Sequence, residues 1–112
     1  MKRPRRSPKV RSQIRAVLRH TQREFGHWKY RQYQDLIREA LDALAKNPEA
    51  GRSRSDIAPD AWDYHIKKEG RRARHLFLYF IADDGVAEIV AFVYDAMDLP
   101  ETMAERPLNF TC

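Results

Sequence analysis

The stretch "HLFLYFIADDGVAEIVAFVYDAMDL", residues 75–99, holds two apolar runs on either side of an Asp84-Gly85 turn. Successive side chains of a strand point to opposite faces, so a hairpin built from these runs is apolar on both faces. Each large apolar side chain left in water forgoes roughly 1.5–3 kcal/mol of burial free energy. The fold of this chain must therefore cover both faces of the hairpin.

Helical periodicity precedes the hairpin and predicts two helices. Ser7-Pro8 is a typical helix entrance, and apolar residues then recur at steps of three and four as far as Gly26, which ends the first helix. A second helix is predicted from His27 to Lys46, before the Asn47-Pro48 stop. Its inner side is predicted to hold Trp28, Tyr33, Leu36, Ile37, Ala40, Leu41 and Leu44.

A strand with period-two alternation begins at Trp62, after a connecting loop rich in Gly, Pro, Ser and Asp. With hairpin strands at 73–82 and 86–95, the order predicts a single α+β domain over 1–112: an antiparallel helical hairpin packed on three or four antiparallel strands. Residues 1–6 are read as a basic segment or an edge strand, and 97–112 as a C-terminal tail.

The two helices can cover only one face of the predicted sheet, so the other face needs a different cover. If Leu76, Leu78, Phe80, Ile89 and Val93 face the helices, then Phe77, Tyr79, Ile81, Val90, Phe92 and Tyr94 face elsewhere, and the reverse assignment leaves a similar excess. Either the tail covers this face alone, or the tail shares it with a partner protein, since soluble monomers rarely expose such a patch.

Charge is distributed unevenly around a net charge of +5. Residues 1–23 hold nine Lys/Arg and no acid, whereas residues 75–105 hold seven Asp/Glu and no Lys/Arg. Arg11, Arg15, Arg19 and Arg23 form a ridge of like charge on the first helix, which costs an isolated helix a few tenths of a kcal/mol, roughly, per pair. The ridge indicates either an anionic partner or a solvated helix face.

Several classes of protein are disfavoured by the sequence. The only cysteine is Cys112, and there is neither an 18-residue apolar run nor a signal-peptide core, so a cytoplasmic protein without membrane attachment is expected. The four histidines lack zinc-ligand spacing, and no phosphate loop or nucleophile elbow is present. We therefore expect no metal and no cofactor.

Three segments, "SPKVRSQI", "YQDLIREALDALAKNPEAGRSRSDI" and "RRARHLFLYFIADDGVAEIVAFVYDAMDL", together resemble the RelE/ParE toxin superfamily over residues 7–100, and within it the ParE-like plasmid stabilisation toxins. The resemblance implies the toxin of a type II toxin–antitoxin system, bound by a ParD-like antitoxin in a hetero-oligomer. The antitoxin would then cover the open sheet face, and its acidic residues would offset the arginine ridge. The predicted antitoxin-binding residues are Arg11, Arg15, Arg19, Phe77, Tyr79, Phe92 and Tyr94.

Two activities occur among such toxins: RelE-like members cleave mRNA on the ribosome, and ParE-like members resemble DNA gyrase poisons. RNA cleavage requires a base, an acid and phosphate-stabilising cations, for which Lys67, Arg74 and His75 are the candidates. However, "YDAMDLPETMAERP" after the last strand is acidic and lacks the basic residue and the later tyrosine of RelE-type nucleases. Its carboxylates would repel a scissile phosphate.

Inhibition of gyrase by protein binding, without catalytic residues, is therefore the favoured activity. The predicted target-binding residues are Lys67, Arg71, Arg72 and Arg74. Two alternatives stay open: a basic nucleic-acid-binding module without toxin activity, whose binding would weaken steeply with salt, and a degenerate toxin that keeps only the fold.

Overall fold

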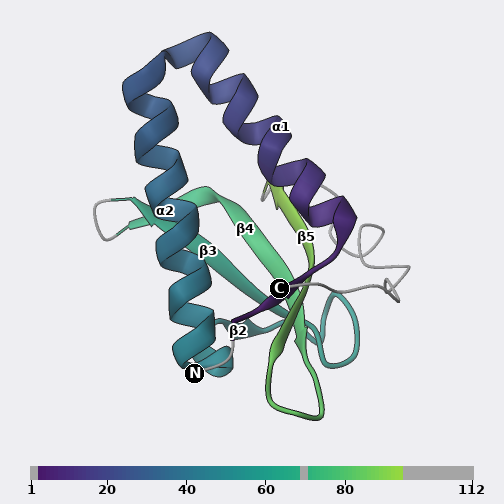
Figure 1. Cartoon of the computed structure of the whole chain (residues 1–112). Coiled ribbons are helices and arrows are strands. Elements are labelled where there is room, and N and C mark those ends of the chain that lie inside the picture. The colour runs from purple at the N-terminus through teal and green to yellow at the C-terminus, as the bar shows by residue number, and fades with distance from the viewer. Residues whose placement is uncertain (1–2, 69–70, 95–112) are drawn as a thin grey trace.

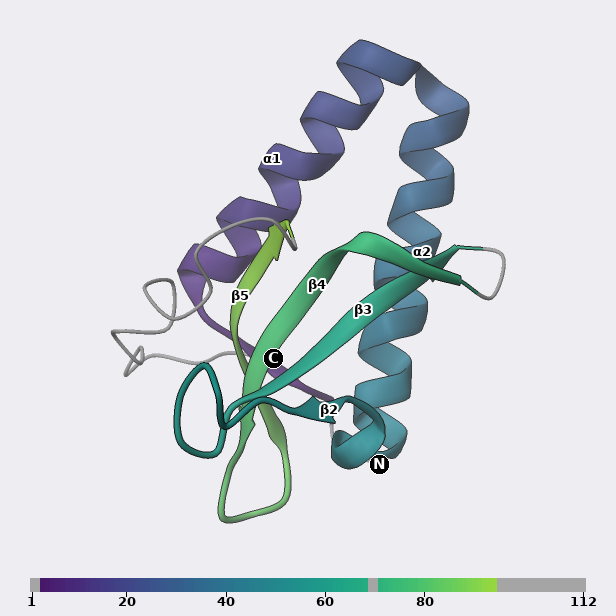
Figure 2. The same cartoon turned by 180° about the vertical axis from the view of Figure 1, so that it is seen from behind.

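A computed structural model of the chain describes residues 3–68 and 71–94. Within these ranges two helices pack on one face of a five-stranded sheet, which confirms the predicted α+β class. Helix α2 crosses in front of β3 in Figure 1 and behind it in Figure 2. Helix α1 packs into the same core as α2, so both helices lie on one side of the sheet. The elements are β1 (Arg5–Arg6), α1 (Pro8–Phe25), α2 (His27–Lys46), the 3₁₀ helix η1 (Pro48–Ala50), β2 (Arg52–Ser53), β3 (Trp62–Lys68), β4 (Arg71–Ile81) and β5 (Ala87–Tyr94).

Both helices have the predicted bounds. The side chain of Ser7 accepts a hydrogen bond from the N–H of Val10 at 3.3 Å and so caps α1. Gly26, with a φ of 88°, ends α1 and directly precedes α2, because this backbone conformation suits glycine. Within the described ranges, neither helix combines the length and apolar content that crossing a membrane requires.

The sheet has the strand order β1-β5-β4-β3-β2. Strands β3, β4 and β5 form the predicted antiparallel core, but the expectation of three or four antiparallel strands is corrected by two short edge strands. Strand β2 is antiparallel to β3, and β1 is parallel to β5. Arg5 of β1 forms ion pairs with Asp84 and Glu88, so the basic N-terminus is drawn to the acidic hairpin.

The face of the sheet toward the helices carries the larger core. Phe77 and Tyr79 of β4 and Phe92 of β5 are buried in it, with exposures of 0%, 0% and 2%. They pack with Val10 of α1 and with Ile37, Ala40, Leu41 and Leu44 of α2. The chain's own helices thus cover these three predicted antitoxin-binding residues, so in this structure they present no surface to a partner.

The opposite face, here called the distal face, carries a second buried cluster. It consists of Ala61, Leu76, Leu78, Phe80, Val90, Ala91 and Val93, none more than 7% exposed. Ile57 and Ala58, from the loop between β2 and β3, pack against it. The expectation that this face stays open for a partner is thus wrong. The predicted C-terminal tail, 97–112, lies outside the described residues.

A bulge in β5 explains why simple alternation misassigned the faces. Leu78 pairs with Ala91 and Tyr79 with Ile89, so Val90 has no counterpart on β4. The extra residue shifts the alternation, and Val90 and Ala91 both join the distal cluster. As a result, Phe92 faces the helices with Ile89.

The apex of the helical hairpin extends beyond the sheet in both views (Figures 1 and 2). Helix α2 has 20 residues and is therefore about 30 Å long, which leaves its first turns without a strand beneath them. Phe25 is 66% exposed and Trp28 is 88% exposed. The prediction that Trp28 lies on the inner side of its helix is wrong for this reason, whereas Ile37, Ala40, Leu41 and Leu44 are buried as predicted.

Candidate functional site

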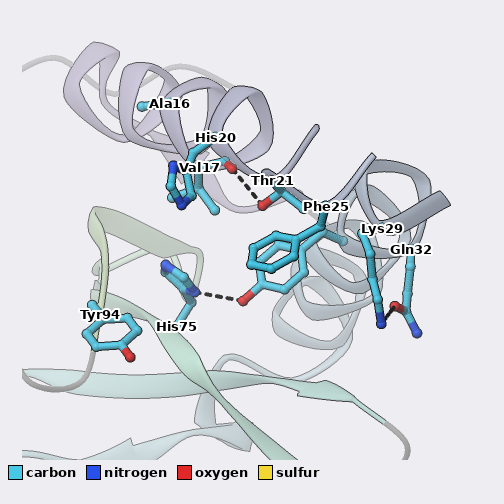
Figure 3. A pocket seen from close by; sticks show the side chains of 10 residues that line it. Ala16, Val17, His20, Thr21, Phe25, Lys29, Gln32, His75 and Tyr94 are labelled. Carbon is cyan, nitrogen blue, oxygen red and sulfur yellow. Dashed lines mark hydrogen bonds between the residues drawn. The ribbon is translucent and has the colours of Figure 1, made fainter. Parts of the chain in front are cut away.

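A pocket opens where the two helices overhang the sheet, and we call it the wedge pocket. It has a volume of about 670 Å³, within the usual range of ligand and peptide pockets. Figure 3 shows α1 on one side, α2 on another, and the ends of β4 and β5 below. Its lining residues are Ala16, Val17, His20, Thr21, Phe25, Lys29, Gln32, Tyr33, His75 and Tyr94.

Exposed apolar surface is concentrated at this pocket. Among the described residues, the large hydrophobic side chains that are exposed are Phe25, Trp28 and Tyr94, the last at 37%. Phe25 and Tyr94 line the wedge pocket, and Trp28 lies three residues beyond Phe25 at the hairpin apex. The sequence predicted exposed apolar surface on one face of the sheet. The structure instead has exposed apolar side chains between the helices and the end of the sheet.

His75 forms the floor of the wedge pocket and is held by aromatic neighbours. Its Nδ1 is hydrogen-bonded to the hydroxyl of Tyr33 at 2.7 Å, which joins β4 to α2 (Figure 3). Its ring stacks on Phe92, with centroids 5.3 Å apart, and meets the edge of Tyr94 at 5.4 Å. Burial, and then the proximity of Tyr94, raise the pKa of Tyr33 above its ordinary value. These contacts give His75 a structural role.

Among the described residues that line the wedge pocket, none carries a carboxylate. His20 and Lys29 line it, and Lys29 Nζ donates to Gln32 Oε1 at 3.5 Å. On α1, a step of four residues turns by about 40°, so the arginine ridge winds slowly around the helix. By this geometry Arg19 comes nearer than Arg15 to the side that holds Ala16 and His20. Arg15 and Arg19 are exposed, and Arg11, farther round the helix, is half-buried.

The predicted target-binding residues lie where β3 ends and β4 begins, or beside Tyr94. Lys67 is exposed, with its Nζ 5.5 Å from the ring centroid of Tyr64. The guanidinium of Arg74 lies over the ring of Tyr94, 4.6 Å from its centroid. The backbone register places Arg72 opposite Lys67 and Arg71 opposite Lys68.

The three candidate nuclease residues do not share one pocket. His75 lines the wedge pocket, whereas Lys67 lines a separate pocket beside β2 and β3. Nδ1 of His75 is also engaged by Tyr33. In residues 3–68 and 71–94, no three His, Cys, Asp or Glu side chains are grouped as metal ligands.

A buried carboxylate, Asp63 on β3, was missed by the sequence reasoning. It is 1% exposed and accepts hydrogen bonds from Nε and Nη2 of Arg52 at 3.3 and 3.1 Å, and from Nη1 of Arg54 at 2.5 Å. Arg54 also pairs with Asp56 through Nε and Nη2, each at 3.0 Å. The available signal was "GRSRSD" ahead of the acidic position in "WDY", which offers two arginines to one strand carboxylate.

The segment after α2 is fixed to the sheet through Tyr79. The Tyr79 hydroxyl donates to the carbonyl oxygen of Pro48 at 2.6 Å and accepts from the N–H of Gly51 at 3.2 Å. A Cβ on Gly51 would lie 2.2 Å from the backbone oxygen of Asp63, so only glycine fits here. The loop that the sequence predicted as a simple connection is therefore a fixed part of the fold.

Comparison with known proteins points to one family. The family model described as ParE toxin of type II toxin-antitoxin system, parDE, matches residues 5–99. This range runs from the first residue of β1 past the last residue of β5 and includes every described helix. None of the curated proteins compared with the chain matches it.

Proposed function

Because the chain belongs to the ParE toxin family, and is thus a toxin of the type II toxin–antitoxin class, we propose that it inhibits DNA gyrase by protein binding. We propose further that a ParD-like antitoxin neutralises it in the cytoplasm by forming a hetero-oligomer. Both steps are recognition events between proteins and require no catalytic residue.

The observation that carries the antitoxin proposal is the gathering of exposed apolar side chains at the wedge pocket. Phe25 and Tyr94 expose apolar surface there, and the ionisable groups among the described lining residues are basic or neutral. An amphipathic segment with apolar side chains on one side and carboxylates on the other matches this surface in shape and charge. Exposed apolar patches of this kind usually mark a protein interface.

The antitoxin-binding residues proposed from the structure differ from those proposed from the sequence. Tyr94 and Arg19 are kept, because Tyr94 lines the wedge pocket and Arg19 directly precedes the lining residue His20 on α1. Phe25 and His20 are added as lining residues. Arg11 and Arg15 lie farther round α1 and are proposed only as long-range contributors, which salt would screen.

Binding without cleavage is supported by the arrangement of the candidate nuclease residues. A general base must reach its proton while a cation stabilises the phosphate, so these groups have to share a site. Here His75 is bound to Tyr33, and Lys67 lines a different pocket. The basic residues at the joined ends of β3 and β4 are better suited to contact an acidic protein surface.

Two parallel assays test the proposed activity. Purified toxin is added to a gyrase supercoiling reaction and, at the same concentration, to a translating extract. We expect loss of supercoiling, with gyrase-linked DNA breaks, and intact mRNA. The double variant Lys67→Glu/Arg74→Glu should restore supercoiling, whereas Lys46→Glu, at the far end of α2, should not. Cut mRNA on ribosomes together with normal supercoiling would replace gyrase by the ribosome as the target.

A further inference from the structure

A small polar pocket lies at the outer edge of the sheet, where β2 ends and β3 continues. Strand β2 pairs only with Trp62 and Asp63, and β3 runs on to Lys68. The pocket has a volume of about 390 Å³. It is lined by Ala50, Gly51, Arg52, Asp63, Tyr64, His65 and Lys67. We call it the edge pocket.

Arg52 presents an oriented donor to the edge pocket. Its Nε and Nη2 are held by the carboxylate of Asp63, which is itself 1% exposed. The Arg52 side chain is nevertheless 53% exposed, and within residues 3–68 and 71–94 no hydrogen bond or ion pair engages its Nη1. A guanidinium whose plane is already fixed loses little conformational entropy when it binds a carboxylate.

Arg54 contacts the same carboxylate, but each of its three guanidinium nitrogens already has a carboxylate partner. Its Nη1 binds Asp63, and its Nε and Nη2 bind Asp56. Its side chain is 22% exposed, less than half the exposure of Arg52. Both arginines therefore bind Asp63, but only Arg52 has an exposed guanidinium nitrogen without a hydrogen-bond partner among the described residues.

The described residues that line the edge pocket carry a net positive charge. The charges of Arg52, Arg54, Asp56 and Asp63 cancel, so Lys67 adds an unbalanced cation to the lining. Glu39 of α2 acts on Tyr64, whose pKa is raised by burial and then by this carboxylate.

We propose that the edge pocket receives a carboxylate from an acidic segment of the protein that the toxin inhibits. Arg52 is its oriented donor, Asp63 is the positioning residue that holds Arg52, and Lys67 is the second cation. The proposal rests on the proposed function, in which the toxin acts by binding a protein target. A nucleic-acid backbone, by contrast, presents a row of phosphates and is bound by a series of cations, whereas one oriented guanidinium and one lysine fit a single carboxylate.

The test compares Arg52→Gln with Arg54→Gln. Each substitution removes one arginine from Asp63 and leaves the other, and Arg54→Gln also removes the ion pair with Asp56, so Arg54→Gln should lower thermal stability at least as much as Arg52→Gln. Affinity for purified gyrase is measured for both, for Lys67→Gln and for the wild type. We expect Arg52→Gln and Lys67→Gln each to weaken binding about tenfold, as for the loss of one charge-assisted hydrogen bond, and Arg54→Gln to leave it within about threefold.

Asp63→Asn tests the positioning role. We expect it to weaken gyrase binding and to leave binding of the co-encoded antitoxin unchanged, whereas a loss of fold would lower both. Equal effects of Arg52→Gln and Arg54→Gln on gyrase affinity would overturn the proposal. It would also be overturned if Arg52→Gln abolished binding to a short DNA duplex and left gyrase binding intact.

Growth arrest on expression separates this proposal from the proposed target. If the wild-type toxin arrests growth without binding gyrase, gyrase is not its target. The edge-pocket proposal is then tested by the effect of the same variants on growth arrest. In that case Arg52→Gln should relieve the arrest and Arg54→Gln should not, and the reverse would overturn the pocket. If the wild-type toxin neither arrests growth nor binds gyrase, both proposals fall.

Discussion

The Tyr79 hydroxyl donates a hydrogen bond to the Pro48 carbonyl oxygen at 2.6 Å and so fixes the segment after α2 to the centre of the sheet. Replacing Tyr79 with phenylalanine keeps the ring, which stacks on Trp62, and removes only the hydroxyl. We expect Tyr79→Phe to lower the free energy of unfolding by about 1–3 kcal/mol, because the Pro48 carbonyl and the Gly51 N–H lose their partner. Urea denaturation measures this change, and Tyr30→Phe at the hairpin apex should stay within about 0.5 kcal/mol as a control.

The Tyr79 hydroxyl also makes the free energy of unfolding depend on pH in the alkaline range. Burial is the main cause that raises the pKa of Tyr79 above its ordinary value. The folded state therefore holds the phenolic proton more tightly than the unfolded state. This contribution is complete below the unfolded pKa of about 10 and is lost as pH rises from there toward the folded pKa. Urea midpoints measured from pH 8 to 11 should fall more steeply for wild type than for Tyr79→Phe, and equal slopes would contradict this assignment.

Gly51 tolerates no side chain, although its backbone conformation is ordinary. An added Cβ would lie 2.2 Å from the Asp63 backbone oxygen and 2.5 Å from the Tyr79 hydroxyl. We expect Gly51→Ala to cost about 2–3 kcal/mol, since the crowded atoms belong to backbone and to a buried ring. The matched variant is Gly85→Ala, where a Cβ meets nothing within 4 Å and only the φ of +81° opposes it. A larger loss of thermal stability for Gly85→Ala than for Gly51→Ala would be the contrary result.

Phe25 and Trp28 form a matched pair at the hairpin apex. Both are exposed, but Phe25 lines the wedge pocket and Trp28 does not. We expect Phe25→Ser and Trp28→Ser each to change stability by less than about 0.5 kcal/mol, because neither side chain is in the core. Phe25→Ser should weaken binding of the co-encoded antitoxin by about tenfold, as measured by calorimetry. A stronger effect of Trp28→Ser would move the antitoxin site from the wedge pocket to the tip of the hairpin.

The helices and the fold class were predictable because their signals are local. Ser7 caps its own helix, Gly26 separates the two helices, and Asn47-Pro48 ends the second, all within a few residues of the boundary. The apolar steps along α2 from Ile37 to Leu44 likewise gave the inner face correctly.

Simple alternation could not predict which side chains of β5 lie on which face of the sheet, because the extra residue of the bulge, Val90, reverses the alternation along the strand. The bulge at Val90 depends on pairing with β4, which no local pattern in β5 reveals. Trp28 was assigned to the core on periodicity alone, but periodicity does not report where the supporting sheet ends. The contacts of Asp63 join residues up to 11 positions apart across a turn and depend on how the loop closes.

Inhibition of gyrase supercoiling by purified toxin, titrated with the co-encoded antitoxin, is the most direct measurement. We predict inhibition by the wild-type toxin alone and full recovery at stoichiometric antitoxin. The Phe25→Ser toxin should inhibit equally and need more antitoxin for the same recovery. Unchanged supercoiling at every toxin concentration, with mRNA cleaved in the parallel translation reaction, would contradict a toxin that acts by binding gyrase.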